Sequence, residues 1–259
     1  MKLLDLTLPT PAENLACDEA LLDACEGGEA EEILRFWEPR TYFVVVGYAN
    51  RVWLEVNREA CEAEKLPVLR RCSGGGTVLQ GPGCLNYALI LNIGEAGPLR
   101  SIGSANRFIM ERNRAALDEL MRCSGRSRQA LTRPSPIADR RQPIEVRGYT
   151  DLAIGGLKVS GNAQRRKNRV LLFHGTFLLE FDLSLMERIL PLPTRQPEYR
   201  QNRPHQEFLA NVGLTADSAK RALQQAWGAF EPFEHLPREK IRLLVRDKYA
   251  NREWNLRFR

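Results

Sequence analysis

The spacing of hydrophobic and polar positions predicts an amphipathic helix near the start of the chain. Apolar residues recur at helical spacing over 12–26, and Gly27 with Gly28 ends the pattern. Two apolar segments follow, over 33–37 and 42–47, and both are typical of strands. The first fifth of the chain therefore already mixes a helix with strands.

The same mixture continues to the end of the chain. Asn57, Ser104 and Thr215 are each followed by a helical pattern and are expected to be N-caps. Gly155 and Gly156 are expected to turn a hairpin. Further strands are expected over 67–71, 77–79, 85–92, 151–154, 157–160 and 170–181, and further helices over 57–65, 104–121, 184–190, 215–229 and 239–259.

Strands and helices do not alternate regularly along this pattern. A doubly wound fold requires such alternation, so we expect an α+β fold with mixed or antiparallel β-sheets flanked by helices. Loops are expected over 124–142, which is polar, basic and contains prolines, over the Arg- and Lys-rich segment 163–169, and over 193–205.

Composition narrows the class of protein. The 259 residues are 43% hydrophobic and 27% charged, which is typical of a globular protein. No stretch approaches the ~18 apolar residues of a membrane span. Asp5 and Pro9 interrupt any signal-peptide apolar region. We therefore expect a cytoplasmic protein without a membrane segment.

The net charge of +6 is typical of a soluble protein with a mildly basic surface, and it is also compatible with an anionic partner: an acidic protein, a phosphate-bearing ligand or a nucleic acid. A nucleic acid is disfavoured, because aromatic residues do not alternate with the basic clusters at 122–141 and 165–169. No helix-turn-helix or zinc module is recognisable either.

Cysteine and histidine placement argues against a metal site. None of the six cysteines forms a C-x-x-C pair, and there are only three histidines, so a structural zinc site is not expected. We expect reduced core cysteines. Cys84 is the exception, because its segment also contains Gly81 and Gly83.

Three segments contain candidate functional residues. Gly74–Gly76 follow a short strand and Arg71, so their backbone can approach an anion closely, although a tight turn explains the glycines equally well. Lys158 stands inside a strand between glycines and is either a charge in a pocket or an edge-strand lysine. His174 is either a ligand-facing or a core histidine, and Asp151 is either a site residue or a turn residue.

Taken together, RRCSGGGTV, GGLKVSGNAQRR and HGTFLLEFDL resemble the lipoate–protein ligase and octanoyl transferase family, which is related in fold to biotin–protein ligases. The resemblance covers about 30–215. We therefore expect a single catalytic domain over 1–259 with a helical extension over about 215–259 and no separate accessory domain.

The resemblance implies that Lys158 is catalytic and contacts the carboxyl oxygen and the phosphate of an acyl-adenylate. It implies a pocket for the acyl chain and the adenylate. The residues expected to line it are Arg71, Ser73, Gly74, Gly75, Gly76, Thr77, Val78, Asp151, Gly161, Asn162, Ala163, His174 and Gly175.

The resemblance leaves two chemistries. A ligase activates lipoate or octanoate with ATP and Mg²⁺, whereas a transferase starts from an acyl-thioester and usually passes the acyl group through a cysteine. Residues 143–150, where one transferase branch has its cysteine, contain none, and no cysteine follows Cys123. We therefore expect an ATP-dependent lipoate–protein ligase.

A thioester-dependent octanoyl or lipoyl transferase and a non-catalytic lipoate-binding protein are the alternatives. The segment Gly81-Pro82-Gly83 resembles the transferases, and Cys84 is then a possible nucleophile. The expected partner is an acidic lipoyl-domain or glycine-cleavage H-like acceptor, attracted by basic residues such as Arg165–Lys167, with a separate accessory protein as a further possibility.

Overall fold

The computed structural model describes residues 1–124 and 142–258. Nearly all of the loop expected over 124–142 thus lies outside the described residues. Within the described part, no helix is long and apolar enough to cross a membrane.

A large sheet of eight strands forms the centre of the molecule, in the order β11-β1-β2-β6-β10-β9-β8-β7. Strand β1 pairs in parallel with β2 and β11, and the remaining neighbours are antiparallel. The strands are β1 Lys2–Asp5, β2 Ile33–Trp37, β6 Cys84–Asn92, β7 Ile144–Arg147, β8 Asp151–Ile154, β9 Leu157–Arg166, β10 Val170–Leu178 and β11 Glu231–Pro232.

A second sheet has the order β4-β3-β5 and is also mixed, because β3 is parallel to β4 and antiparallel to β5. Its strands are β3 Phe43–Val46, β4 Val68–Arg70 and β5 Val78–Gln80. The expected α+β fold with mixed sheets is therefore confirmed.

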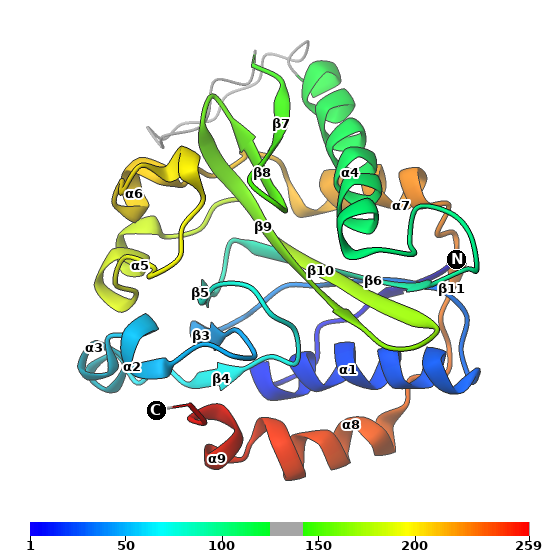
Figure 1. Ribbon diagram of the computed structural model, residues 1–259, viewed down its shortest axis with the longest axis horizontal. Coiled ribbons are helices and arrows are strands. Elements are labelled where there is room, and N and C mark those ends of the chain that lie inside the picture. The colour runs from blue at the N-terminus through cyan, green and yellow to red at the C-terminus, as the bar shows by residue number, and fades with distance from the viewer. Residues whose placement is uncertain (125–141, 259) are drawn as a thin grey trace.

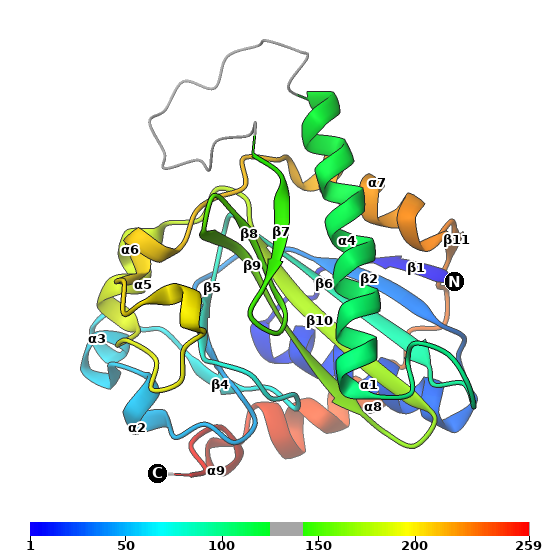
Figure 2. The ribbon, with the colours of Figure 1, turned by 45° about the horizontal axis from the view of Figure 1, so that its top comes forward.

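Helices cover both faces of the large sheet (Figure 1). Helix α1 lies along one face with α8 outside it, while α4 and α7 cover the other face (Figure 2). The helices are α1 Pro11–Gly27, α2 Val52–Glu55, α3 Arg58–Ala63, α4 Ile102–Ser124, α5 Leu183–Ile189, η1 Glu198–Arg200, α6 His205–Phe208, α7 Ala216–Trp227, α8 Arg238–Leu244, η2 Val245–Tyr249 and α9 Arg252–Asn255.

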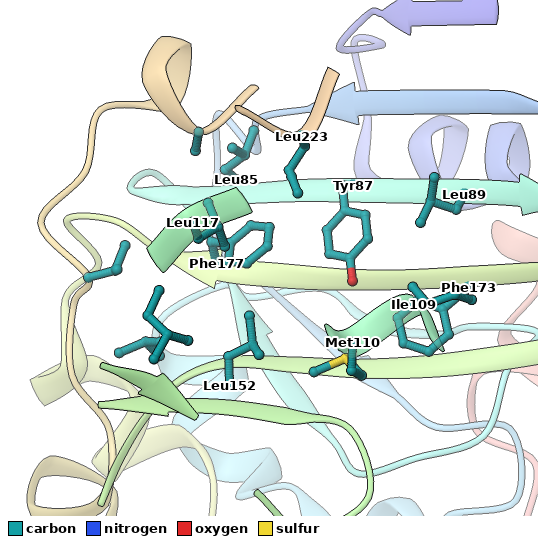
Figure 3. Packing of buried hydrophobic residues seen from close by; sticks show 14 of the residues in the cluster. Leu85, Tyr87, Leu89, Ile109, Met110, Leu117, Leu152, Phe173, Phe177 and Leu223 are labelled. Atoms are coloured by element: carbon teal, nitrogen blue, oxygen red, sulfur yellow. The ribbon is translucent and has the colours of Figure 1, made fainter. Parts of the chain in front are cut away.

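The alternation of side chains along β10 separates the core from the site. Phe173 and Phe177 point toward α4 and pack with Tyr87 of β6 (Figure 3). His174 and Thr176 lie at the intervening positions, and successive strand residues point to opposite faces. They therefore face the side of the sheet that α1 covers.

Several expected element boundaries are confirmed and several are wrong. Asn57 and Thr215 accept the capping hydrogen bonds of α3 and α7. Helix α4 begins before Ser104, and Ser101 Oγ accepts from Ser104 N instead. Strand β9 continues through most of the expected loop at 163–169, because its backbone pairs with β10. Strands β1 and β7 were not expected.

Candidate active site

A cavity of about 450 Å³ brings the three predicted segments together. The glycine turn after β4 closes one side of it, and β9 and β10 form another. Of the expected site residues, the following line it: Arg71, Gly75, Gly76, Thr77, Val78, Asp151, Lys158, Gly161, Asn162, Ala163, His174 and Gly175. Ser73, Gly74 and Cys84 are not among the described residues that line it.

Arg71 braces the glycine turn from within. Its Nη2 donates to Gly74 O at 2.6 Å and to Gly76 O at 2.7 Å, and its Nε donates to Ser73 Oγ at 3.1 Å. Burial lowers the pKa of this guanidinium to about 10, which leaves it charged at neutral pH. Gly75 adopts φ +86°, and an added Cβ would lie 2.9 Å from Arg71 Nη2. A side chain at position 75 would therefore disturb the turn.

Arg70, which sequence reasoning missed, supports this turn from the outside. Its Nη1 donates to the carbonyls of Gly47 and Asn50 at 2.8 and 2.9 Å. Its Nε and Nη2 donate to Trp254 O and Arg257 O at 3.1 and 2.6 Å. One buried guanidinium thus links the loop beneath the glycine turn to the C-terminal segment.

Lys158 is held by a carboxylate at the edge of the cavity. Its Nζ lies 2.7 Å from Asp151 Oδ1, and Tyr199 Oη donates to Asp151 Oδ2 at 2.9 Å. Burial and the adjacent Asp151 charge raise the pKa of Tyr199 above its usual range. A Cβ at Gly161 would lie 2.9 Å from Lys158 Nζ, so the ammonium lies directly against this glycine. Lysine, carboxylate and glycine therefore form one unit.

Asn162 fastens neighbouring segments to the sheet. Its Nδ2 donates to Thr150 O at 2.7 Å, and its Oδ1 accepts from Tyr87 Oη at 2.7 Å. The side chain passes over Gly175, where an added Cβ would overlap Asn162 Oδ1. The amide is therefore engaged by the protein, and Gly175 makes the crossing possible.

His174 lies in a chain of polar groups beneath the glycine turn. Its Nε2 is 2.6 Å from Ser73 Oγ, and its Nδ1 is 3.2 Å from Asp18 Oδ2. Asp18 also pairs with the buried Arg35. Burial raises the pKa of Asp18, but Arg35 and His174 outweigh this effect and hold it below its usual range.

The order serine–histidine–aspartate matches that of a nucleophilic triad. Ser73 is nevertheless fully buried, so its hydroxyl cannot reach a substrate in the cavity. The hydrogen-bonded series Ser73–His174–Asp18 therefore positions the glycine turn.

A second polar group that the motifs did not predict lies on the same face. Gln80 Nε2 donates to Thr176 Oγ1 at 2.6 Å, Thr176 Oγ1 donates to Asn86 Oδ1 at 2.5 Å, and Asn86 Nδ2 donates to Gln80 Oε1 at 3.0 Å. All three residues line the cavity. None of the three side chains carries a charge, and they satisfy one another's hydrogen-bonding groups in this part of the wall.

The cysteines do not contribute a nucleophile to this cavity. All six fall within the described residues; five are buried, Cys123 is exposed, and none of them lines the cavity. Burial raises the pKa of Cys84 to about 12, so its thiol stays protonated and unreactive at neutral pH.

Nothing among the described residues supports the expected Mg²⁺. In the described part of the chain, no group of three or more His, Cys, Asp or Glu side chains could hold a metal ion. Three of the described carboxylates line the cavity: Asp18 is paired with Arg35, Asp151 is paired with Lys158, and Glu55 accepts a hydrogen bond from Thr194 Oγ1.

One cavity thus combines a strand-borne lysine, a braced glycine turn and apolar walls, and no cysteine is among the described residues that line it. Comparison with known proteins gives the family. The profile described as "Lipoyl protein ligase A/B catalytic domain" matches residues 10–220. The chain therefore belongs to the lipoyl protein ligase A/B catalytic-domain family, and the predicted resemblance is confirmed.

Curated relatives specify the branch of this family. The chain is 28% identical to "Octanoyltransferase LipM" of Brevibacillus brevis, over 96% of this chain and 95% of the relative. It is 28% identical to the protein of the same name from Bacillus subtilis, over 95% and 94%. With the one from Clostridioides difficile it shares 32% identity over 73% and 69%.

Solved structures show the same fold. A lipoate-protein ligase A bound with ATP superposes with a TM-score of 0.76 at 24% identity, over 100% of this chain and 99% of the other. The bipartite lipoate protein ligase of Thermoplasma acidophilum, described with its E2 lipoyl domain, gives a TM-score of 0.75 at 21% identity, over 100% and 98%.

The prediction of an ATP-dependent lipoate–protein ligase is contradicted by the names of these curated relatives, which are octanoyltransferases. That prediction rested on the lack of a cysteine near Lys158. The chemical reason for the error is that a thioester is already an activated acyl group. An amine can attack it directly when the developing negative charge is stabilised, so a missing cysteine does not demand adenylation by ATP.

Proposed function

We propose that this protein transfers an octanoyl group from a thioester donor to a lysine of a lipoyl-domain acceptor protein. The observation that carries the proposal is that the Lys158–Asp151 pair and the braced glycine turn line the same cavity. The relatives named octanoyltransferase support octanoyl as the acyl group. The T. acidophilum ligase described with its E2 lipoyl domain supports a lipoyl domain as the acceptor.

The wall of the cavity suits a medium-length acyl chain. Apolar side chains from α1, β2 and the small sheet line it, namely Leu15, Trp37, Val45, Val78 and Leu79. Burial of each methylene contributes about 0.8 kcal/mol, so the alkyl part of an octanoyl chain would contribute favourably to donor binding. The carbonyl group would then lie at the polar end of the cavity, beside Lys158.

The proposed reaction is a single acyl transfer, in which a thioester is converted to an amide. The neutral amine of the acceptor lysine attacks the thioester carbonyl carbon, a C–N bond forms and the C–S bond breaks. The thiolate leaves and takes the proton that the amine gives up. Lys158 would stabilise the oxygen anion that forms in between, and Asp151 would hold the ammonium in place. Because no cysteine lines the cavity, we propose direct transfer without an acyl-enzyme.

ATP and Mg²⁺ enter no step of this reaction. Lipoate would enter only as a lipoyl thioester, as a second donor. A basic surface would steer an acidic acceptor to the site. The five buried free thiols suit a reducing compartment, so we place the reaction in the cytoplasm.

The experiment mixes the purified protein with an octanoyl-thioester of a carrier protein and an apo lipoyl domain, without ATP. The acceptor should gain the mass of one octanoyl group, and an acceptor whose target lysine is replaced by arginine should gain none. A protein that modifies the acceptor only from free octanoate with ATP contradicts the proposal.

A further inference from the structure

A series of hydrogen bonds runs through the hydrophobic core from helix α7 to the cavity. Trp227 Nε1 donates to Asn113 Oδ1 at 2.8 Å, and Asn113 Nδ2 donates to Tyr87 Oη at 2.9 Å. Tyr87 Oη donates in turn to Asn162 Oδ1 at 2.7 Å, which connects the series to β9. We call Trp227, Asn113 and Tyr87 the core relay.

The core relay is buried among apolar side chains. Asn113 is 0% exposed, Tyr87 1% and Trp227 8%, and Figure 3 shows Tyr87 among the apolar residues of its cluster. A buried polar group costs free energy unless its hydrogen bonds are made, and apolar side chains at these positions would avoid that cost. A fully bonded polar series is suited instead to fixing one arrangement of the segments that it joins.

The indole of Trp227 fixes the direction of the bonds in the relay. An indole N–H only donates, so Asn113 must present its oxygen to Trp227 and its NH₂ group to Tyr87. Burial raises the pKa of the Tyr87 phenol above its usual range, so the hydroxyl keeps its proton and donates a hydrogen bond to Asn162. The Asn162 amide is thereby oriented with its NH₂ group toward Thr150.

The far end of the relay holds the residue that precedes Asp151. Asn162 Nδ2 donates to Thr150 O at 2.7 Å, and Thr150 Oγ1 donates to Asn162 O at 2.7 Å. The pairing of β8 with β9 ends at Asp151 and Gly161, so these two bonds continue it by one residue. Asp151 in turn holds Lys158, with 2.7 Å between Oδ1 and Nζ.

We propose that the core relay consists of positioning residues for the reaction: it orients Asn162 and thereby sets the place of the Asp151–Lys158 pair. Its members act through Asn162 and not on the reacting atoms. The packing of α4 and α7 on one face of the sheet is thereby connected to the cavity. The expected effect on the rate rests on the proposed octanoyl transfer, whereas the effect on the geometry does not.

A spectrum that needs no turnover tests the positioning directly. In ¹H–¹⁵N spectra of the whole protein, the side-chain amide of Asn162 and the backbone N–H of Asp151 flank the Thr150 contact. Tyr87→Phe removes the hydroxyl that orients Asn162, so both signals should shift, and the Asn162 amide protons should exchange with water about tenfold faster. Trp227→Phe should move the same signals by less, because only the orientation of Asn113 is then released.

Leu223→Ala is the matched control. Leu223 is a fully buried residue of α7 in the same core cluster, so its truncation loosens the packing around the relay without removing a polar group. The Asn162 and Asp151 signals should stay as in wild type. Arg242→Gln, which removes an exposed arginine of α8 that is paired with Glu239, is the surface control.

The turnover number for octanoyl transfer should fall about tenfold to 10²-fold in Tyr87→Phe, with the donor KM within about twofold of wild type. Because the relay acts through Asp151, the double variant Tyr87→Phe/Asp151→Asn should be about as slow as Asp151→Asn alone. A merely structural role of Tyr87 would instead multiply the two losses and would lower the rate in Leu223→Ala as well.

Unchanged Asn162 and Asp151 signals in Tyr87→Phe overturn the proposal. So does a turnover number that Leu223→Ala lowers as much as Tyr87→Phe, and so do multiplied losses in the double variant. If Tyr87→Phe does not fold, Trp227→Phe decides by the same signals. If wild type transfers no octanoyl group, the proposed function fails, and the spectra alone decide on the core relay.

Discussion

Lys158 Nζ lies 2.7 Å from Asp151 Oδ1, while Tyr199 Oη holds the other oxygen of the same carboxylate. Asp151 therefore positions Lys158, the side chain that we propose to stabilise the oxyanion, and Tyr199 in turn holds Asp151 in place. Asp151 opens β8 and Lys158 is the second residue of β9, so the hairpin turn at Gly155–Gly156 sets this distance.

Asp151→Asn should lower the turnover number for octanoyl transfer by about tenfold or more, because Lys158 loses its ionic partner. The KM for the donor should change less, since the apolar wall of the cavity is untouched. Steady-state kinetics on both parameters test this prediction. Tyr199→Phe is the matched variant and should show a smaller loss in the same direction.

Cys84→Ala should keep the transfer rate within about twofold of wild type, because the buried, protonated thiol does not reach the cavity. Replacing the small core side chain should cost about 1 kcal/mol of stability. Transfer rates measured at a temperature where the variant is folded check the first prediction, and urea denaturation checks the second, with Cys123→Ala as an exposed control. A loss of transfer in Cys84→Ala alone would assign a nucleophile to this position and exclude direct transfer.

Arg70→Lys should weaken both stability and donor binding. An ammonium presents its three N–H donors from a single nitrogen, so it cannot bond the loop at Gly47–Asn50 and the C-terminal carbonyls at once. We expect a loss of about 2 kcal/mol or more in the free energy of unfolding, and a raised donor KM. Urea denaturation and steady-state kinetics measure the two effects.

Arg252→Gln, an exposed change on α9, is the control and should leave both stability and donor KM unchanged. If Arg70→Lys left the donor KM unaltered, the C-terminal segment would have no effect on the site.

The buried His205 should make the protein less stable in mild acid. Its pKa is about 4 in the folded protein and about 6.5 when unfolded. Below pH 6.5 the unfolded chain therefore binds more protons, and stability falls as the pH drops toward 4. The full loss is of the order of 3 kcal/mol. Urea denaturation at pH 7 and pH 4.5 should show this fall in wild type and a smaller one in His205→Gln. Equal falls in the two proteins would show that His205 is not buried in its neutral form.

The motifs predicted most of the site because glycines and a strand lysine leave a local pattern. Gly74–Gly76, Lys158 and His174 are separated along the chain, yet each segment shows its own break in an apolar stretch. The α+β fold followed from the order of the elements. Strand β1 was missed because four residues next to the terminus show little periodicity.

Partners distant in sequence left no such pattern. Arg70 Nε donates to Trp254 O, 184 positions away in the sequence, and no motif in either segment predicts this contact. Arg200 and His205 line the cavity, yet they lie in a Pro- and Arg-rich segment that looks like an ordinary loop. The choice between ligase and transferase was wrong because the absence of a cysteine near Lys158 was taken to decide the reaction, whereas the curated relatives are octanoyltransferases.

The single-turnover rate of amide formation from an octanoyl thioester, measured for wild type and for Lys158→Ala, tests the central claim most directly. Loss of one donor at a developing oxyanion should lower this rate about 10²- to 10³-fold, with an unchanged fold and with Arg242→Gln as the control at wild-type rate. A rate for Lys158→Ala within about threefold of wild type would contradict the assignment of the reaction to this cavity.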